Sequence, residues 1–323
     1  MNSALLESPF SKRLFPYVWN LGDAKVLRTD EIRRPIGFSI PGEKALSVTL
    51  EVEGRTATGF GEGEEELAYK RAYSEALERL ALFSFCARTE AKESSNGWAA
   101  HTLPALAIDA AILELIERDV ALTAWENGGP FYVLPDALWP SILTPWHSLE
   151  SRRAEYSDLK LLLTHSENGA AISALLFNGR GNCVAGHGSS VTIEGAIRSA
   201  VNECFRAAHA ALRFANLSDV FALHLETDRR QRFEPSAHSL AYAYREPFPA
   251  EVRVEPISEA EALGIWERHR QNFLQLDRAA LDIILIDAGT HVVARVKSPR
   301  YRQIYWGRCP DVSKPNQRPH FVG

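Results

Sequence analysis

The stretch LAYKRAYSEALERLA, residues 67–81, contains a helical pattern that recurs twice more along the chain. The pattern is Ala-x3-Ala-x2-Glu, followed three residues later by Glu or Arg. The other two copies lie in ALAIDAAILELIERDVA (105–121) and GAIRSAVNECFRAA (195–208). Steps of four and three residues keep side chains on one helical face, so each copy places small alanines and a carboxylate on the same stripe. Each stretch therefore predicts a closely packed helix with a glutamate carboxylate on its packed face.

The glutamates of the three copies are the candidate metal ligands. A buried carboxylate must be paired or coordinated, and Mg²⁺ prefers such oxygen ligands, usually together with phosphate. We therefore predict that the three helices converge on one acidic centre that holds Mg²⁺. The alternative is a set of ordinary solvated helix faces, because Ala and Glu are both good helix formers. The candidate ligands are Glu75, Glu78, Glu114, Glu117 and Glu203.

A glycine-rich segment precedes the first and third helices. These segments are Thr58-Gly59-Phe60-Gly61 and Ala185-Gly186-His187-Gly188. Glycines in a turn between a strand and a helix would let backbone N–H groups approach a phosphate at the helix N-terminus. The repeated pairing of glycines with a carboxylate helix predicts an internal duplication around a nucleotide, with His187 in a loop.

Bulk composition limits the class of protein. The chain has 323 residues, of which 46% are hydrophobic and 24% charged, and a formal net charge of −5. These values are typical of a soluble globular protein and give no general attraction to nucleic acid or to an anionic membrane. No apolar run approaches the ~18 residues of a membrane span, so we expect a cytoplasmic protein. The four cysteines are too widely spaced for a typical zinc site or disulfide framework.

The pattern of elements predicts an α+β fold, with mixed or antiparallel sheets, packed helices and an internal duplication. A hairpin is expected around Gly54, and Gly128-Gly129-Pro130 should end the second helix. The segment 1–40 is expected to be irregular because prolines interrupt it, and a turn is expected over 178–182. Helices are predicted over 64–87, 104–127, 192–214 and 258–276, and later strands over 161–164, 171–177, 183–185, 282–287 and 291–297.

Several segments, taken in order, resemble the YcaO family. They are SEALERL, SSNGWAAH, AILELIERD, GHGSSVTIEGAIRSAVNECFRAA and VVARVKSP followed by IYWG. The resemblance implies an ATP- and Mg²⁺-dependent peptide cyclodehydratase of ribosomal natural-product biosynthesis, which phosphorylates backbone amides. A neighbouring Cys, Ser or Thr of the substrate would give an azoline. Sulfide would give a thioamide, a backbone amine would give an amidine, and a catalytically weak scaffold is a further alternative.

The resemblance also implies roles for particular residues. Arg206, Arg295 and the carboxylate of Gly323 are the implied catalytic groups. Arg79 and Arg118 could instead form ion pairs on their own helices, and Arg295 could be a buried structural arginine. The implied ATP-binding residues are Ser74, Glu75, Arg79, Asn96, Glu114, Arg118, Asn202, Arg206 and Arg295.

Two features depart from the family pattern. Arg206 stands where the family usually has Gln, and the prolines of the tail are scattered rather than arranged as Pro-x-Pro-x-Pro. The expected organisation is an irregular segment 1–40, a catalytic domain 41–310 and a tail 311–323. The expected partners are a precursor peptide, a ThiF-like leader-binding protein and a flavin dehydrogenase, in a homodimer or hetero-complex.

Overall fold

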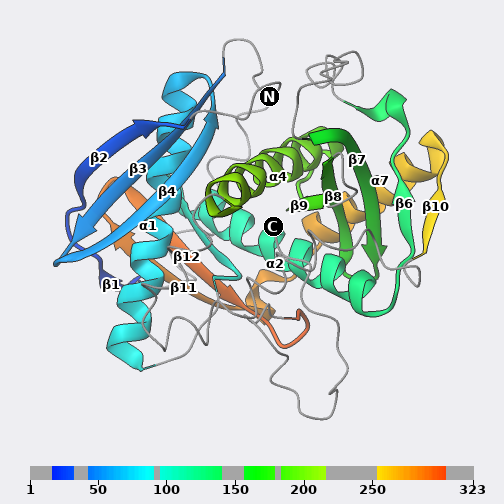
Figure 1. Ribbon diagram of the computed structural model, residues 1–323. Helices are drawn as coiled ribbons and strands as arrows, with labels where there is room; N and C mark the ends of the chain where they lie inside the picture. Colours follow the sequence, from blue (N-terminus) through cyan, green and yellow to red (C-terminus); the bar gives the residue numbers. More distant parts are fainter. Residues whose placement is uncertain are drawn as a thin grey trace. The chain divides into compact units, whose positions relative to one another are not determined.

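The computed structural model describes residues 17–32, 43–90, 95–139, 156–178, 183–215 and 253–302 (Figure 1). The chain divides into two compact units. Unit 1 comprises Met1–Arg33, Pro41–Leu115 and Asp277–Arg300, and unit 2 comprises Arg34–Ile40, Ile116–Leu276 and Tyr301–Gly323. No helix within the described ranges is long and apolar enough to cross a membrane.

Unit 1 packs helix α1 (Glu65–Thr89) against two sheets. The buried stripe of α1, which includes Ala72 and Leu77, meets Val48 from one sheet and Val293 from the other. The first sheet has the order β2 (Lys25–Glu31), β3 (Lys44–Val52), β4 (Arg55–Gly63). The second has the order β1 (Tyr17–Asn20), β11 (Asp282–Ala288), β12 (His291–Lys297), β5 (Trp98–His101). The 3-10 turn η4 (Arg278–Ala280) precedes β11.

Unit 2 is built on one five-stranded sheet. Helices α4 (Ile193–Ala215) and α7 (Glu259–Leu274) belong to this unit, and α2 (Pro104–Glu126) begins in unit 1 and ends in unit 2. A capping box between Ser258 and Glu261 fixes the start of α7. The 3-10 turn η2 (Asp136–Leu138) follows the second strand of the sheet. The strand order is β10 (Val254–Pro256), β6 (Phe131–Val133), β7 (Tyr156–Ser166), β8 (Gly169–Asn178), β9 (Cys183–Gly188).

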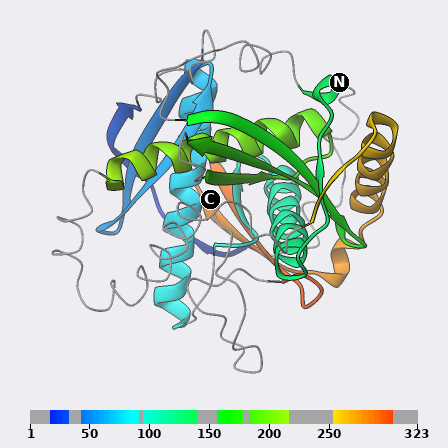
Figure 2. The same cartoon turned by 45° about the vertical axis from the view of Figure 1, so that its right-hand side comes forward.

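Alternate leucines of β7 pack on opposite faces of this sheet, as strand geometry requires. Leu161 and Leu163 join the cluster formed with α4 and α7, whereas Leu162 packs with Trp125 near the end of α2. Helix α4, yellow-green, lies beside the green strands β8 and β9 in both views (Figures 1 and 2). The sheet therefore lies between α4 and α7 on one side and α2 on the other.

The units repeat one motif, three antiparallel strands followed by a helix: β2-β3-β4-α1 and β7-β8-β9-α4. The last strand is the sheet edge in both copies, and two of its glycines face the helix. A Cβ on Gly59 would collide with the backbone of Ala72 and Ala76, and one on Gly186 would collide with that of Ala200 and Cys204. The predicted internal duplication is thus confirmed.

The same motif corrects the interpretation of the glycines. Gly59 and Gly61 lie inside β4, and Gly186 and Gly188 lie inside β9. They form no turn at a helix N-terminus. They leave room for the helix backbone to pack directly on the edge strand, which explains why the facing helix positions carry small side chains, mostly alanine.

Most predicted elements are confirmed, including the hairpin at Gly54, the four helices and the late strands. The segment 1–40 is not irregular throughout, because β1 and β2 lie within it. Most of β2 is exposed, so it lacks the alternation that would reveal a strand in the sequence. The predicted turn over 178–182 lies largely outside the described residues, as does the tail with Gly323.

Candidate active site

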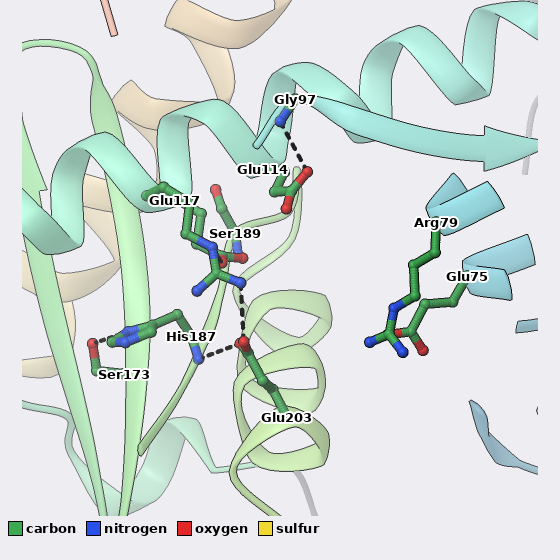
Figure 3. Close-up of polar contacts among 10 residues, drawn as sticks. Glu75, Arg79, Gly97, Glu114, Glu117, Ser173, His187, Ser189 and Glu203 are labelled. Carbon is green, nitrogen blue, oxygen red and sulfur yellow. Dashed lines mark hydrogen bonds and ion pairs between the residues drawn. The ribbon is translucent and has the colours of Figure 1, made fainter. Parts of the chain in front are cut away.

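Glu75 of α1 is held against the edge strand that precedes its own helix. Its Oε2 accepts a hydrogen bond of 2.6 Å from the Phe60 amide. Its Oε1 forms an ion pair of 2.7 Å with Arg79, whose guanidinium also donates to the Thr58 carbonyl and stacks 5.5 Å from the centre of the Phe60 ring. The carboxylate is therefore oriented by a backbone amide and by Arg79, and Figure 3 shows Glu75 beside Arg79.

Glu114 of α2 makes the equivalent contact with β5. Its Oε2 accepts hydrogen bonds from the amides of Gly97 at 3.0 Å and Trp98 at 3.3 Å. Strand β5 is again the edge of its sheet and again precedes the helix. Gly97 has a φ of +74° and packs so closely that a Cβ would clash with the Val296 carbonyl.

Glu203 of α4 repeats the contact in unit 2. Its Oε2 accepts a hydrogen bond of 2.7 Å from the His187 amide in β9 (Figure 3). Its Oε1 is 2.9 Å from the guanidinium of Arg118, which comes from a different helix, α2. The Arg118 Nε lies 3.2 Å from Glu117, and Glu117 Oε2 accepts a bond of 3.1 Å from the Ser189 amide. An ordered chain of charges thus joins α2, β9 and α4.

The pKa of Glu203 is about 2, below its ordinary 4.5. Burial alone would raise this pKa. The nearby positive charge of Arg118, with contributions from His187 and Arg206 and the hydrogen bond from the His187 amide, outweighs the effect of burial. Glu203 is therefore ionised at every physiological pH.

The first glutamate of all three helical patterns has one shared role. Each accepts a backbone N–H from the edge strand that precedes its own helix: Phe60 for Glu75, Gly97 and Trp98 for Glu114, and His187 for Glu203. An ionised carboxylate has about four lone-pair sites, so these bonds leave it able to coordinate a further ligand. Metal-ligating carboxylates are themselves usually hydrogen-bonded in this way.

The other predicted site residues have varied surroundings. Ser74, Glu78 and Arg206 are half-buried, and Asn202 is buried. Arg295 is buried, donates to Asp282 at 3.0 Å and lies 5.1 Å from the Phe85 ring centre. The structural interpretation of Arg295 therefore has direct support. Arg79 pairs on its own helix as anticipated, whereas Arg118 also reaches α4.

Asn96 directly precedes the Gly97 amide that binds Glu114. Its side chain is 2% exposed, and within the described residues its Nδ2 has no hydrogen-bond partner. A buried donor without a partner costs about 1–3 kcal/mol. Among the described residues, Asn96 therefore keeps an unused donor next to the amide that binds Glu114, as a site for an oxygen-rich molecule would require.

Two buried histidines next to the candidate ligands and their hydrogen-bond partners were not singled out from the sequence. His187 lies in β9 rather than in a loop, is buried, and its Nδ1 is 3.0 Å from the Ser173 hydroxyl. His269 of α7 is also buried. In the sequence, His187 stands between two glycines, and His269 lies on the apolar stripe of an amphipathic helix; these were the features that could have singled them out.

No group of three or more His, Cys, Asp or Glu side chains in the described ranges forms a ready metal cage. Mg²⁺ commonly uses only one or two carboxylates and completes its shell with phosphate oxygens and water. The hydrogen-bonded glutamates and the unused Asn96 donor fit a metal that arrives with a nucleotide. The convergence of all three helices spans both units and stays a prediction.

Comparison with known proteins defines the class. The family model described as YcaO cyclodehydratase, ATP- and Mg²⁺-binding, matches residues 80–301. The chain therefore belongs to the YcaO family, whose cofactors are ATP and Mg²⁺. No curated protein matches the sequence.

Solved structures share the fold at low sequence identity. A YcaO protein from Methanopyrus kandleri, bound with AMPPCP and Mg²⁺, has a TM-score of 0.52 at 16% identity, with 84% of each chain covered. A chain of the E. coli microcin synthetase McbBCD complex with pro-MccB17 bound has a TM-score of 0.57 at 12% identity, covering 89% of this chain and 91% of that one. These similarities establish the α+β YcaO fold.

Proposed function

We propose that this protein is a peptide cyclodehydratase that uses Mg-ATP to convert Cys, Ser or Thr residues of a ribosomally made precursor into thiazoline or oxazoline rings. Family membership supports the ATP-dependent chemistry, and the substrate and ring type are the proposed refinement. Residues 41–310 would form the catalytic domain, working in the cytoplasm.

The main support for this proposal is a contact that occurs three times, in which a motif glutamate accepts a hydrogen bond from a backbone amide at an edge strand. Groups that are fixed before a ligand binds lose little entropy on binding. In the proposed site, Glu75, Glu78, Glu114, Glu117 and Glu203 would hold the metal. Glu114 and Glu117 are three residues apart on α2, so they lie on the same face of that helix.

The remaining polar residues would bind the nucleotide. Asn96 would offer the donor that has no partner within the described part of the chain, and the arginines would neutralise phosphate charge. Ser74, Arg79, Arg118, Asn202 and Arg206 are the other proposed contacts. Arg295 already contacts Asp282 and Phe85, so we propose that it supports the structure of the site and does not contact the nucleotide directly.

Bound ATP would supply the phosphoryl group that turns the amide oxygen into a leaving group. The chain's own task is to orient the phosphates and the amide, and to stabilise charge with fixed groups. The Gly323 carboxylate is proposed to help position the amide. Arg302, the last described residue, donates its amide hydrogen to Asp119 Oδ1 at 2.9 Å, one residue from Arg118.

Calorimetric titration with the non-hydrolysable analogue AMPPNP, with and without Mg²⁺, tests the cofactor part of the proposal. We expect binding that depends on Mg²⁺, and at 100 times Kd a gain in stability of about 2.7 kcal/mol. Absence of binding by the full chain would favour the scaffold alternative.

Peptide processing tests the chemistry. Glu78→Gln and Glu117→Gln should each lower turnover of a Cys/Ser/Thr-rich precursor at least about tenfold, whereas Glu66→Gln, on the outer face of α1, should not. Loss of one water per ring would identify an azoline, and exchange of oxygen for sulfur a thioamide. A precursor, a ThiF-like protein and a flavin dehydrogenase are the proposed partners, in a homodimer or hetero-complex.

A further inference from the structure

Helix α7 contains a buried histidine that lies outside the three motif helices. His269 is 2% exposed and packs edge-on against Trp266, with the ring centres 5.0 Å apart. It occupies a position on the buried stripe of α7 together with Ala262, Ile265 and Phe273. An apolar residue would fill this position without burying two ring nitrogens, so the partners of those nitrogens matter.

Both ring nitrogens have defined partners. Nδ1 accepts a hydrogen bond of 3.2 Å from the Ala170 amide, which has only a proton to offer. Nδ1 therefore carries no proton, and in the neutral ring the proton is on Nε2. Nε2 lies 3.2 Å from the Ser190 carbonyl and 3.3 Å from the Ser189 hydroxyl. Burial lowers the pKa of His269, which favours this neutral form.

The loop that accepts the hydrogen bond from His269 Nε2 also contacts Glu117. The Ser189 amide donates to Glu117 Oε2 at 3.1 Å, and the Ser189 hydroxyl donates to the Ala170 carbonyl at 3.0 Å. His269 thus contacts two segments, the start of β8 at Ala170 and the loop after β9. From that loop, bonds continue through Glu117 and Arg118 to Glu203.

The surrounding sequence makes room for the ring. Gly169 has a φ of +150°, and a Cβ there would lie 2.8 Å from His269 Nδ1 and 2.6 Å from Ile116. The turn is held at further points, because Asn168 donates to Asp119 at 2.8 Å and Asn272 of α7 donates to the Glu167 carbonyl at 3.5 Å. The turn is therefore braced by α2 and by α7.

We infer that His269 is a positioning residue that fixes the Ser189–Ser190 loop and thereby the orientation of the Glu117 carboxylate. This role rests on the proposed function, in which Glu117 binds Mg²⁺. Residues that orient a metal ligand typically change metal affinity about 10- to 100-fold when removed. The loss should be seen in nucleotide binding at limiting Mg²⁺, and not only in stability.

Three variants of the full chain separate positioning from packing. His269→Leu removes both hydrogen bonds and keeps an apolar side chain. His269→Gln retains a donor and an acceptor. Phe273→Leu, one turn further along α7 and also buried, perturbs the core and serves as the control. All three are compared with the unmodified chain for AMPPNP affinity across Mg²⁺ concentrations, and for hydrogen–deuterium exchange of the segment 187–192 without ligand.

We expect His269→Leu to speed exchange in 187–192 and weaken Mg-AMPPNP binding at least tenfold, with a higher Mg²⁺ requirement. His269→Gln should lose less, and Phe273→Leu should match the unmodified chain in both readouts. Unchanged loop exchange in His269→Leu, or faster exchange with unchanged nucleotide affinity, would overturn the positioning role alone. An unmodified chain that binds no Mg-AMPPNP would overturn the proposed function, and with it this role.

Discussion

The two strand–helix repeats hold their first glutamate by the same bond but surround it with different charges. In unit 1, the partner of Glu75 is Arg79, one turn along the same helix, and their side chains are 25% and 38% exposed. In unit 2, the partner of Glu203 is Arg118 from another helix, and these side chains are 16% and 15% exposed. The repeat determines where each carboxylate lies, and the neighbouring elements determine which arginine it meets and how far the pair is buried.

Removing the arginine should therefore have the largest effect in unit 2. Arg118→Met leaves two acidic groups, Glu117 and Glu203, close together in a poorly solvated place. We expect a loss of about 3 to 5 kcal/mol in the free energy of unfolding, measured by urea denaturation. A loss below 1 kcal/mol would show that the buried and exposed pairs are energetically alike.

The contribution of Glu203 to stability should depend on pH. A fall in the pKa of Glu203 from 4.5 to about 2 corresponds to about 3 kcal/mol of stability at neutral pH. Because the folded-state pKa is the lower one, this stability is fully present above pH 4.5 and is lost as the pH falls towards 2. The stability gap between the unmodified chain and Glu203→Gln should close over that range in denaturant melts. A gap that is independent of pH would mean that Glu203 contributes by packing or neutral hydrogen bonding.

Glycine replacements test what the repeats share. Gly59→Ala and Gly186→Ala each force a methyl group against a helix backbone, so each should cost about 2 kcal/mol, within the usual range for overpacking. Gly264→Ala in α7, where the nearest atom to a new Cβ is 3.8 Å away, is the control and should be neutral or stabilising. A large difference between Gly59→Ala and Gly186→Ala would break the equivalence of the two repeats.

The smallest effect is expected for Glu75 and Arg79, the more exposed of the two pairs. Arg79→Met should cost about 0.5 kcal/mol, because exposed ion pairs are weak and screened by salt. Thermal or urea unfolding at two salt concentrations would measure it. A cost close to that of Arg118→Met would show that the bond from Arg79 to the Thr58 carbonyl is worth far more than the ion pair.

Helical periodicity predicted the helices well because each carries a long apolar stripe, and the hairpin at Gly54 had both alternation and a turn residue. The glycines of β4 and β9 were interpreted as turns because a sequence does not show what packs against a strand. Strand β2 was missed because its exposed edge position removes any alternation.

The residues of the candidate site could be singled out from the sequence by their type, but the groups that they contact could not. Helical spacing singled out Glu75, Glu114 and Glu203, yet their bonds to edge-strand amides depend on the sheets. His269 could not be found from spacing because its partners, Ala170 and Ser190, lie far away in sequence. Contacts of this kind follow from tertiary packing alone.

The second sheet of unit 1 also constrains the order in which the chain can fold during its synthesis. Strand β1 pairs with β11, and β5 pairs with β12, so strands from the beginning and the end of the chain share one sheet. On the ribosome, unit 1 cannot complete this sheet until β12 has emerged, whereas the sheet of unit 2 is complete once β10 has emerged. Such long-range pairing is slow to form, and a nascent chain stalled before Asp282 would expose the unpaired edges of β1 and β5.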